Sequence, residues 1–341
     1  MSEISIYTYL EPFLYGQSRE AIQRVVRGVE SVDRCLIGYH SFGPDGWILG
    51  SYVLSMSEHL NIMIAHRPGV MQPVVAARMA ATLSAASSGR SALHIVTGGA
   101  PGDQYREGDY VGHDERYKRS SEYVQVMRKV WDATEPFSFE GDFYKFEDVR
   151  LGQKPGGDIL IHMGGASPAA LEFGARDADV YLLWGEPLQA VRDRVEAITA
   201  SAVAVGRSRP RISLSLRLYT ADTDEAAWDV AKSEPAYQKY VAKGGGVTDR
   251  SHAEDAGRNR QLTFAREGET HDDCLWMGLV AALNGLGNAA ALVGTEDRVL
   301  SALQLYADAG VDTFLIAGSG GSWTPDLVKL AEKIKVEVKL R

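Results

Sequence analysis

Strand-length apolar runs alternate with helical stretches along most of this chain of 341 residues. The eight runs that fit a buried strand are Ile4–Leu10, Cys35–Tyr39, Asn61–His66, Leu93–Val96, Ile159–Met163, Val180–Leu183, Ile212–Tyr219 and Thr313–Ala317. Helical spacing of apolar residues follows most of them, as in Gln72–Ser87. Repeated strand–helix units make the strands parallel, and eight such units favour a closed (β/α)8 TIM barrel. We therefore predict an α/β fold with a single barrel domain over residues 1–341.

Two insertions interrupt this alternation. In Phe137–Val149, apolar residues alternate around Glu140-Gly141-Asp142, which predicts a β-hairpin. The segment Lys243–Asp273 is rich in Gly, Arg, Asp and His and has little apolar periodicity, so we predict a loop without regular structure. Because it follows the seventh strand, this loop leaves the face of the barrel on which active sites lie. A mobile lid and a disordered surface insertion are both compatible with the sequence.

Composition limits the partners of the chain. The net charge of −9 argues against nucleic acid or an anionic membrane as partner. An anionic small molecule stays possible, because a local Arg can override the global sign. Cys35 and Cys274 have apolar neighbours, so we expect two buried free thiols and no metal site. There is no apolar run of about 18 residues and no basic-then-apolar N-terminus, so we expect a cytoplasmic protein without a signal peptide.

Two glycine-rich turns are candidates for binding a phosphate group. Met163–Ser167 precedes Pro168, so Ser167 can cap a helix whose first residue is Pro168. Backbone N–H groups at such a strand-to-helix turn bind phosphate well. The turn Gly318–Ser322 follows the eighth strand, where many barrels bind phosphate. Glycine spacing does not separate the two, and either could be an ordinary tight turn.

Three polar residues lie where ligands could reach them. His113 and Tyr117 are four residues apart at the start of a predicted helix, so they share a face at an end that favours negative charge. The alternative is that His113 and Tyr117 only form the start of the helix and bind no ligand. Arg217 lies within the apolar seventh strand, where a charge needs either a ligand or an internal ion-pair partner.

The segment Ser91–Tyr117 resembles the signature of the bacterial luciferase-like flavin-dependent monooxygenases, most closely that of the alkanesulfonate monooxygenases. It combines Val96-Thr97-Gly98 with the phrase His113–Tyr117. Further matching motifs follow the family order: Arg67-Pro68, Ala76-Ala77-Arg78, Gly164-Gly165, Trp184–Pro187, Arg217 and Ala291–Gly294. The resemblance extends from about Ile4 to Lys335 and implies a TIM barrel that binds reduced FMN.

The resemblance also implies residue roles. Flavin contacts are expected from Ala65, His94, Thr97, His113, Tyr117, Gly164, Gly165 and Ser167, with the phosphate at the turn Gly164–Ser167. The family usually has Asn where this chain has His94; a strand His can also be a satisfied core residue. The expected catalytic residues are Arg217, Arg266, Trp184, Tyr219 and His40. For Trp184 the alternative is a packed core residue, for Arg266 a solvated loop charge, and for His40 a structural role.

The reaction that the resemblance implies is monooxygenation with O2 as co-substrate. A separate NAD(P)H:FMN reductase would supply FMNH2, and a flavin (hydro)peroxide would oxidise a small organosulfur substrate. An alkanesulfonate would give an aldehyde and sulfite. Proteins of this family often form dimers or tetramers, so the resemblance also implies a homo-oligomer.

This chain departs from the alkanesulfonate pattern on the substrate side. It has Ser41-Phe42-Gly43 in place of a Cys, Tyr219 in place of a His, and Gly318–Trp323 in place of a Tyr and a His. Other readings therefore stay open: a sulfone, alkane, aldehyde or other carbon substrate, a flavin-binding protein without turnover, or a deazaflavin-dependent oxidoreductase.

Overall fold

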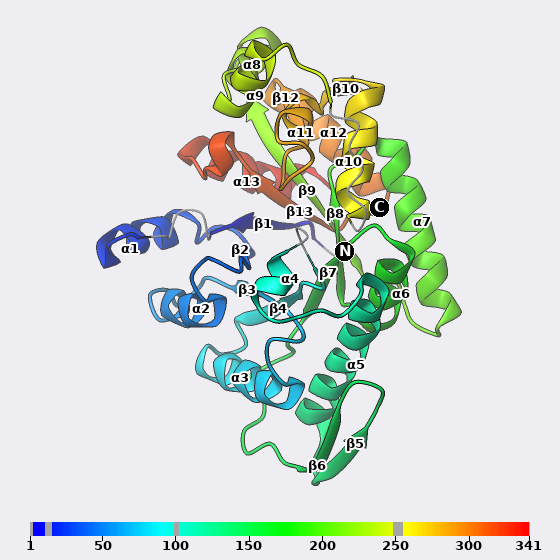
Figure 1. Ribbon diagram of the computed structural model, residues 1–341. Helices are drawn as coiled ribbons and strands as arrows, with labels where there is room; N and C mark the ends of the chain where they lie inside the picture. The colour runs from blue at the N-terminus through cyan, green and yellow to red at the C-terminus, as the bar shows by residue number, and fades with distance from the viewer. Residues whose placement is uncertain (1–2, 11–15, 99–101, 248–254, 341) are drawn as a thin grey trace.

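Eight parallel strands form a closed barrel at the centre of this computed structural model, which describes residues 3–10, 16–98, 102–247 and 255–340 (Figure 1). They are β1 (Ser5–Tyr9), β2 (Arg34–Ile37), β3 (Ile62–His66), β4 (Ser91–Ile95), β7 (Ile161–Gly164), β8 (Val180–Trp184), β9 (Arg211–Thr220) and β13 (Thr313–Ala317). Each strand pairs in parallel with the next, and β13 pairs with β1, which closes the barrel. All eight predicted strands are therefore confirmed.

Helices surround the barrel on its outside (Figure 1). They are α1 (Arg19–Gly28), α2 (Gly46–Leu54), α3 (Pro73–Ala86), α5 (His113–Asp132), α6 (Pro168–Asp177), α7 (Leu188–Ala204), α8 (Asp224–Lys232), α12 (Glu296–Asp308) and α13 (Pro325–Glu337). Local sequence fixes the residues at which several of these helices begin. The side chains of Ser167 and Thr324 accept N-capping hydrogen bonds, and Pro follows each of them at the first helical position. These caps set where α6 and α13 leave the carboxyl ends of their strands.

The predicted hairpin is present as β5 (Phe137–Glu140) and β6 (Lys145–Val149), which pair antiparallel. Its turn is fastened to α5, because the carboxylate of Glu122 accepts backbone hydrogen bonds from Asp142 at 2.9 Å and Tyr144 at 2.7 Å. The hairpin extends along the end of α5, away from the barrel (Figure 1).

Several short elements lie beyond the carboxyl ends of the strands. They are α4 (Asp103–Arg106), α9 (Pro235–Ala242), α10 (Ala256–Glu267), β10 (Thr270–His271), β11 (Leu275–Trp276), α11 (Gly278–Ala282), β12 (Ala291–Gly294) and a 3-10 turn, η2 (Ser319–Gly321). β8 pairs with the first half of β9, and β12 pairs with its second half in the register Ala291↔Arg217. β12 thus prolongs the wall of the barrel beyond β8.

The prediction of a structureless loop over 243–273 is wrong for its second half, where α10 forms. Asp255 caps this helix by accepting a hydrogen bond from the Arg258 N–H at 2.9 Å. Within α10, the side chains of Gln261 and Leu262 are buried. So narrow a buried face leaves almost no apolar periodicity to detect. Residues 248–254 of the predicted loop lie outside the described residues.

Cys35 and Cys274 are both buried free thiols, as predicted. Inside the barrel, Tyr7, Met63, Ala92 and Leu315 belong to a small apolar cluster that fills the lumen. In the described ranges, no helix has the length and apolar character needed to cross a membrane. The filled lumen leaves the carboxyl ends of the strands as the place for a ligand.

Candidate active site

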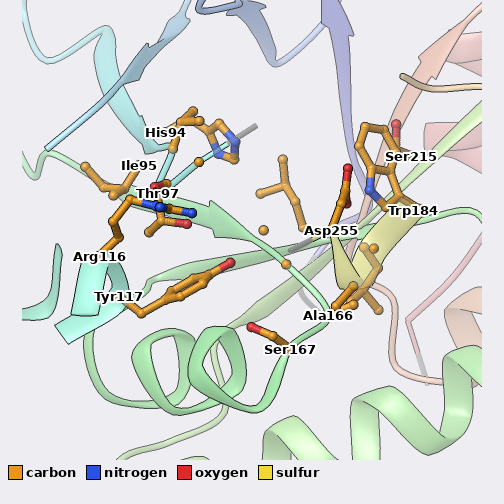
Figure 2. Close-up of a pocket in the computed structure, with 18 of the residues that line it drawn as sticks. His94, Ile95, Thr97, Arg116, Tyr117, Ala166, Ser167, Trp184, Ser215 and Asp255 are labelled. Carbon is orange, nitrogen blue, oxygen red and sulfur yellow. Dashed lines mark hydrogen bonds between the residues drawn. The ribbon is translucent and has the colours of Figure 1, made fainter. Parts of the chain in front are cut away.

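A cavity of about 320 Å³ opens at the carboxyl ends of the barrel strands (Figure 2). The ends of β4, β7 and β8 and the first residues of α5, α6 and α10 surround it. Its floor is formed by lumen-facing residues of four further strands, Tyr9, Leu36, Ser215 and Leu315. The cavity therefore combines an apolar base with a rim of helix starts.

Seven of the eight residues predicted to contact a flavin line this cavity: His94, Thr97, His113, Tyr117, Gly164, Gly165 and Ser167. The eighth, Ala65, packs into the apolar cluster of the lumen and pairs with His94 in the sheet. The structure thus brings together residues from two separate strand–helix junctions, β4–α5 and β7–α6.

The turn between β7 and α6 is held in one conformation. Gly165 has a φ of +152°, and a Cβ there would lie 2.6 Å from Ala170 Cβ and 2.9 Å from the Tyr117 hydroxyl. Its carbonyl oxygen accepts hydrogen bonds from Arg194 at 2.8 Å and from Tyr181 at 2.9 Å. Ser167 Oγ caps α6 by accepting from the Ala170 N–H at 3.1 Å. The N-terminus of α6 is therefore fixed at the cavity, where it favours a negatively charged ligand.

Tyr117 and Ser167 direct their hydroxyl groups into the same space (Figure 2). Burial raises the pKa of Tyr117, against the opposing effect of hydrogen bonds with the Thr97 and Ser167 side chains. The phenol is therefore neutral at physiological pH and can donate a hydrogen bond. The His113 ring meets the Tyr117 ring edge-on at 5.2 Å, and its Nδ1 is 2.6 Å from Asp114 Oδ1.

Arg116 is a lining residue that the sequence did not single out. It is only 7% exposed, and its Nε donates to the Thr97 carbonyl oxygen at 3.0 Å. Its Nη1 donates to the Val111 carbonyl oxygen at 2.7 Å. Its position inside the phrase His113–Tyr117 was the available signal. Arg116 lies three residues after His113 in α5, so the two side chains share a helix face.

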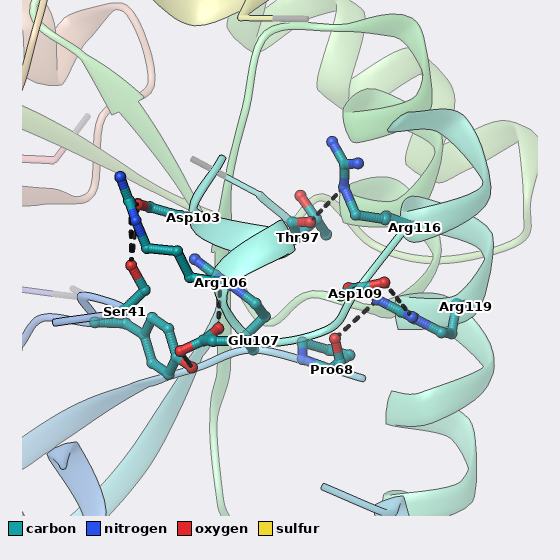
Figure 3. Close-up of polar contacts among 11 residues, drawn as sticks. Ser41, Pro68, Thr97, Asp103, Arg106, Glu107, Asp109, Arg116 and Arg119 are labelled. Carbon is teal, nitrogen blue, oxygen red and sulfur yellow. Dashed lines mark hydrogen bonds and ion pairs between the residues drawn. The ribbon is translucent and has the colours of Figure 1, made fainter. Parts of the chain in front are cut away.

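Two ion pairs hold described residues 102–112, which precede α5 (Figure 3). Arg67 and Glu107 are paired at 2.5 Å, and Arg119 and Asp109 are also paired at 2.5 Å. Arg119 further donates to the Pro68 carbonyl oxygen at 3.0 Å. Described residues 102–112 are thereby attached to the start of the β3–α3 connection and to α5.

His94 lines the cavity next to its floor. Its Nδ1 is buried and has no hydrogen-bond partner among the described residues. Burial lowers the pKa of His94 to about 4, so the imidazole is neutral at physiological pH. A neutral imidazole can donate or accept one hydrogen bond toward a ligand ring. Nearby on the floor, the Tyr9 hydroxyl lies 3.0 Å from Ser215 Oγ.

The wall opposite Tyr117 is made by Trp184 and the start of α10 (Figure 2). A Cβ on Gly257 would lie 3.4 Å from Trp184 Nε1, so the helix rests on the indole edge. Arg260 Nε lies 2.7 Å from each oxygen of the buried Glu186, and Gln261 donates to the Gly185 carbonyl oxygen at 3.0 Å. Part of the predicted lid segment therefore forms a wall of the cavity, and its mobility stays a prediction.

The other residues predicted to be catalytic lie apart from this lining. Arg217 and Tyr219 contact Glu234 beyond the end of the barrel. His40 is exposed beside Phe42, and Arg266 is exposed on α10.

The second phosphate candidate, Gly318–Ser322, is occupied by the protein itself. Glu234 Oε1 accepts hydrogen bonds from Ser319 Oγ at 2.9 Å and from the Gly320 N–H at 2.7 Å. The turn between β7 and α6 is therefore the better phosphate site of the two.

A closed parallel barrel with a cavity at the carboxyl ends of its strands is the architecture of TIM-barrel enzymes. A family model described as luciferase-like monooxygenase matches residues 11–313, so the chain belongs to this family.

Solved structures support the same fold. A riboflavin lyase, solved with modified FMN and riboflavin, is similar with a TM-score of 0.77 at 16% identity, over 99% of this chain and 93% of that one. The oxygenating constituent of 3,6-diketocamphane monooxygenase from Pseudomonas putida, in complex with FMN, has a TM-score of 0.72 at 19% identity, covering 99% and 98%. The F420-dependent tetrahydromethanopterin reductase of Methanopyrus kandleri has a TM-score of 0.70 at 18% identity, covering 99% of each chain.

Proposed function

We propose that this protein is a two-component monooxygenase that uses reduced FMN supplied by a separate NAD(P)H:FMN reductase. The observation that carries the proposal is the meeting of Arg116, Tyr117 and Ser167 at the N-terminus of α6, on the rim of an apolar cavity. Such a donor set suits a phosphate group, and the floor beside it suits a flat apolar ring.

The described residues fit FMN. Ser167 Oγ, the Tyr117 hydroxyl, the Arg116 guanidinium and the backbone N–H groups of the turn would hold the phosphate. His94 and Trp184 would lie along the ring, and the Nδ1 of His94, which no described residue contacts by a hydrogen bond, offers one more polar contact at this wall. When bound, reduced flavin supplies the electrons that activate O2. The chain positions the ring, excludes water and provides fixed charge.

For the substrate we propose a small organosulfur compound, with an alkanesulfonate as the specific candidate. The balance would be RCH2SO3⁻ + FMNH2 + O2 giving RCHO, SO3²⁻, FMN, H2O and H⁺. Arg217 would supply charge on the substrate side, with Trp184 as the wall of the pocket. The alternative is a related monooxygenase of a sulfone, alkane, aldehyde or other carbon substrate. We also propose that the enzyme acts as a homo-oligomer.

A deazaflavin-dependent oxidoreductase is the second candidate, because an F420-dependent enzyme shares the fold. Direct titration of the protein with FMN, reduced FMN and the deazaflavin separates the two. Tighter binding of the deazaflavin would replace our first proposal.

The proposed function is tested by reductase-dependent O2 consumption and by flavin affinity. Consumption should rise on addition of the true substrate, and sulfite should appear if that substrate is a sulfonate. Tyr117→Phe and Ser167→Ala should each weaken FMN binding, whereas Tyr52→Phe on α2, outside the cavity lining, is the matched control. Unchanged affinity in both site variants would refute this placement of FMN.

A further inference from the structure

One carboxylate oxygen, Glu234 Oε1, is surrounded by donors from two parts of the chain, β9 and the turn after β13. It accepts hydrogen bonds from the Tyr219 hydroxyl at 2.7 Å, Ser319 Oγ at 2.9 Å and the Gly320 N–H at 2.7 Å. Arg217 Nη1 lies 3.6 Å from the same oxygen. Burial alone would raise the pKa of Glu234, but these hydrogen bonds and the Arg217 charge lower it. The carboxylate is therefore ionised at neutral pH.

The donors around Glu234 come from one barrel strand and from the turn that follows another, whereas Glu234 belongs to neither. Arg217 and Tyr219 lie on β9, and Ser319 and Gly320 form the turn after β13. Arg217 is held from a second side, because its Nε donates to the Asn288 carbonyl oxygen at 2.7 Å. Glu234 is the residue before α9, in the insertion that follows the seventh barrel strand. The donor cluster is thus part of a fixed frame, and its acceptor comes from an added segment.

This cluster adjoins the candidate active site. Arg217 follows Ser215 by two residues on β9, so both side chains point to the same face of the sheet, and Ser215 lines the cavity. Ser319 and Gly320 are exposed, which leaves the cluster open to solvent on its outer side. The cluster offers a guanidinium, two hydroxyl groups and one backbone N–H. Donors of these kinds bind the oxygens of a carboxylate or a sulfonate.

We propose that Arg217, Tyr219, Ser319 and Gly320 form an anion-binding site that Glu234 fills, and that an anionic group of the substrate takes the place of Glu234. The ligand class is a singly charged oxyanion, either a carboxylate or a sulfonate. The exchange couples binding to α9, because the displaced Glu234 carries the start of that helix. The identification of the ligand as substrate rests on the proposed function; the existence of the site does not.

The site is tested by replacing Glu234 and adding the anion from solution. In Glu234→Ala, Arg217 loses its carboxylate partner in a largely buried position, which destabilises the fold. Acetate and methanesulfonate should then bind in the vacated position and raise the melting temperature by about 3 °C or more over equimolar chloride. The weaker variant Glu234→Gln keeps an acceptor oxygen and is measured if Glu234→Ala does not fold. Stronger rescue by methanesulfonate than by acetate would identify sulfonate as the preferred anion.

Two controls separate this site from general salt effects. Asp224→Ala removes one of the two carboxylate partners of Arg298 in a more exposed ion-pair cluster, so it reports the non-specific effect of each salt. Glu234→Ala combined with Arg217→Gln removes the proposed anion site and should lose the anion dependence. Equal anion dependence in Asp224→Ala, or its persistence in the double variant, would overturn the site.

The exchange step is tested in the unmodified protein. Saturating methanesulfonate should increase hydrogen exchange of the backbone amides in α9 (Pro235–Ala242) and leave α3 (Pro73–Ala86) unchanged. No change in α9 would overturn the displacement of Glu234. Both experiments are done without flavin, so a failure of FMN to bind would count against the proposed function and not against this site.

Discussion

Arg116 Nε donates to the Thr97 carbonyl oxygen across 3.0 Å, which joins the first turn of α5 directly to the end of β4 (Figure 3). The same guanidinium donates to the Val111 carbonyl oxygen, so it links Thr97 to the residues just before α5. A buried cation is thereby held on the cavity rim that also carries Tyr117 and Ser167. This fixed positive charge belongs to the candidate phosphate site.

Arg116→Ala should weaken FMN binding by roughly 10–100-fold, because a hydrogen bond to a charged group is worth about 1.5–3 kcal/mol. Arg116→Lys should recover part of the loss, since it keeps the charge without the planar fork. Fluorescence titration with FMN measures the effect. Arg176→Ala, which removes an exposed Arg on α6, is the control. Equal affinities for both Ala variants would mean that the phosphate lies elsewhere.

Gly165→Ala should abolish FMN binding as well as lower stability. The new Cβ would lie 2.6 Å from Ala170 Cβ and 2.9 Å from the Tyr117 hydroxyl, so the phosphate turn must shift. Gly206→Ala is a matched control, because Gly206 also has a positive φ, of +76°, but has no atom within 4 Å of the added Cβ. Both variants should melt at a lower temperature, and only Gly165→Ala should lose flavin affinity. Normal FMN binding by Gly165→Ala would contradict the role of this turn.

The barrel could be predicted because its strands are buried on both faces. Runs such as Val180–Leu183 are apolar throughout, and buried parallel strands have this pattern. The positions of Thr97, Tyr117 and Ser167 at the ends of strands or the starts of helices could be predicted from local sequence, and all three line the cavity. Their expected flavin roles came from the family resemblance, because spacing alone left ordinary helix-start and turn roles open.

Features that depend on contacts between distant segments were not predictable. α10 is stabilised by polar contacts such as that of Arg260 with Glu186, 74 residues away, and these leave no apolar period in the sequence. β12 has four residues and finds its partner in the second half of β9. Likewise, the sequence left the turn Gly318–Ser322 equal to the other phosphate candidate, because nothing local indicates that Glu234 fills it.

Asp109→Asn should reduce the free energy of unfolding at neutral pH by about 3–5 kcal/mol, the usual effect of removing one partner of a buried ion pair. Burial acts to raise the pKa of Asp109, but hydrogen bonds from Arg119 and Val111 outweigh it and lower this pKa. A carboxyl group with a lowered folded-state pKa stabilises the fold above its unfolded-state pKa, near 4, and loses this effect as pH falls through the folded-state value.

The difference between Asp109→Asn and the parent protein should therefore be largest near neutral pH and shrink below about pH 4. Urea unfolding at a series of pH values measures it. Asp326→Asn, in an exposed ion pair with Lys329, should change the unfolding free energy little at any pH. A difference that stays constant down to strongly acidic pH would show that Asp109 acts through packing and not through its charge.

The contact of Arg260 with Glu186 should set how firmly α10 closes the cavity. Arg260→Gln removes the cation that meets both oxygens of the buried Glu186 at 2.7 Å, and the Gln261 bond to Gly185 remains. Hydrogen exchange in α10 should rise by roughly tenfold or more, because the loss of a partly buried ion pair favours local opening by about 1–2 kcal/mol. Thr263→Ala, an exposed change on the same helix, should leave the exchange rates unchanged.

In the parent protein, FMN and substrate together should slow exchange in α10, and Arg260→Gln should reduce this protection. If ligands protect α10 equally in both proteins, the ion pair is structural and the helix does not open as a lid through it.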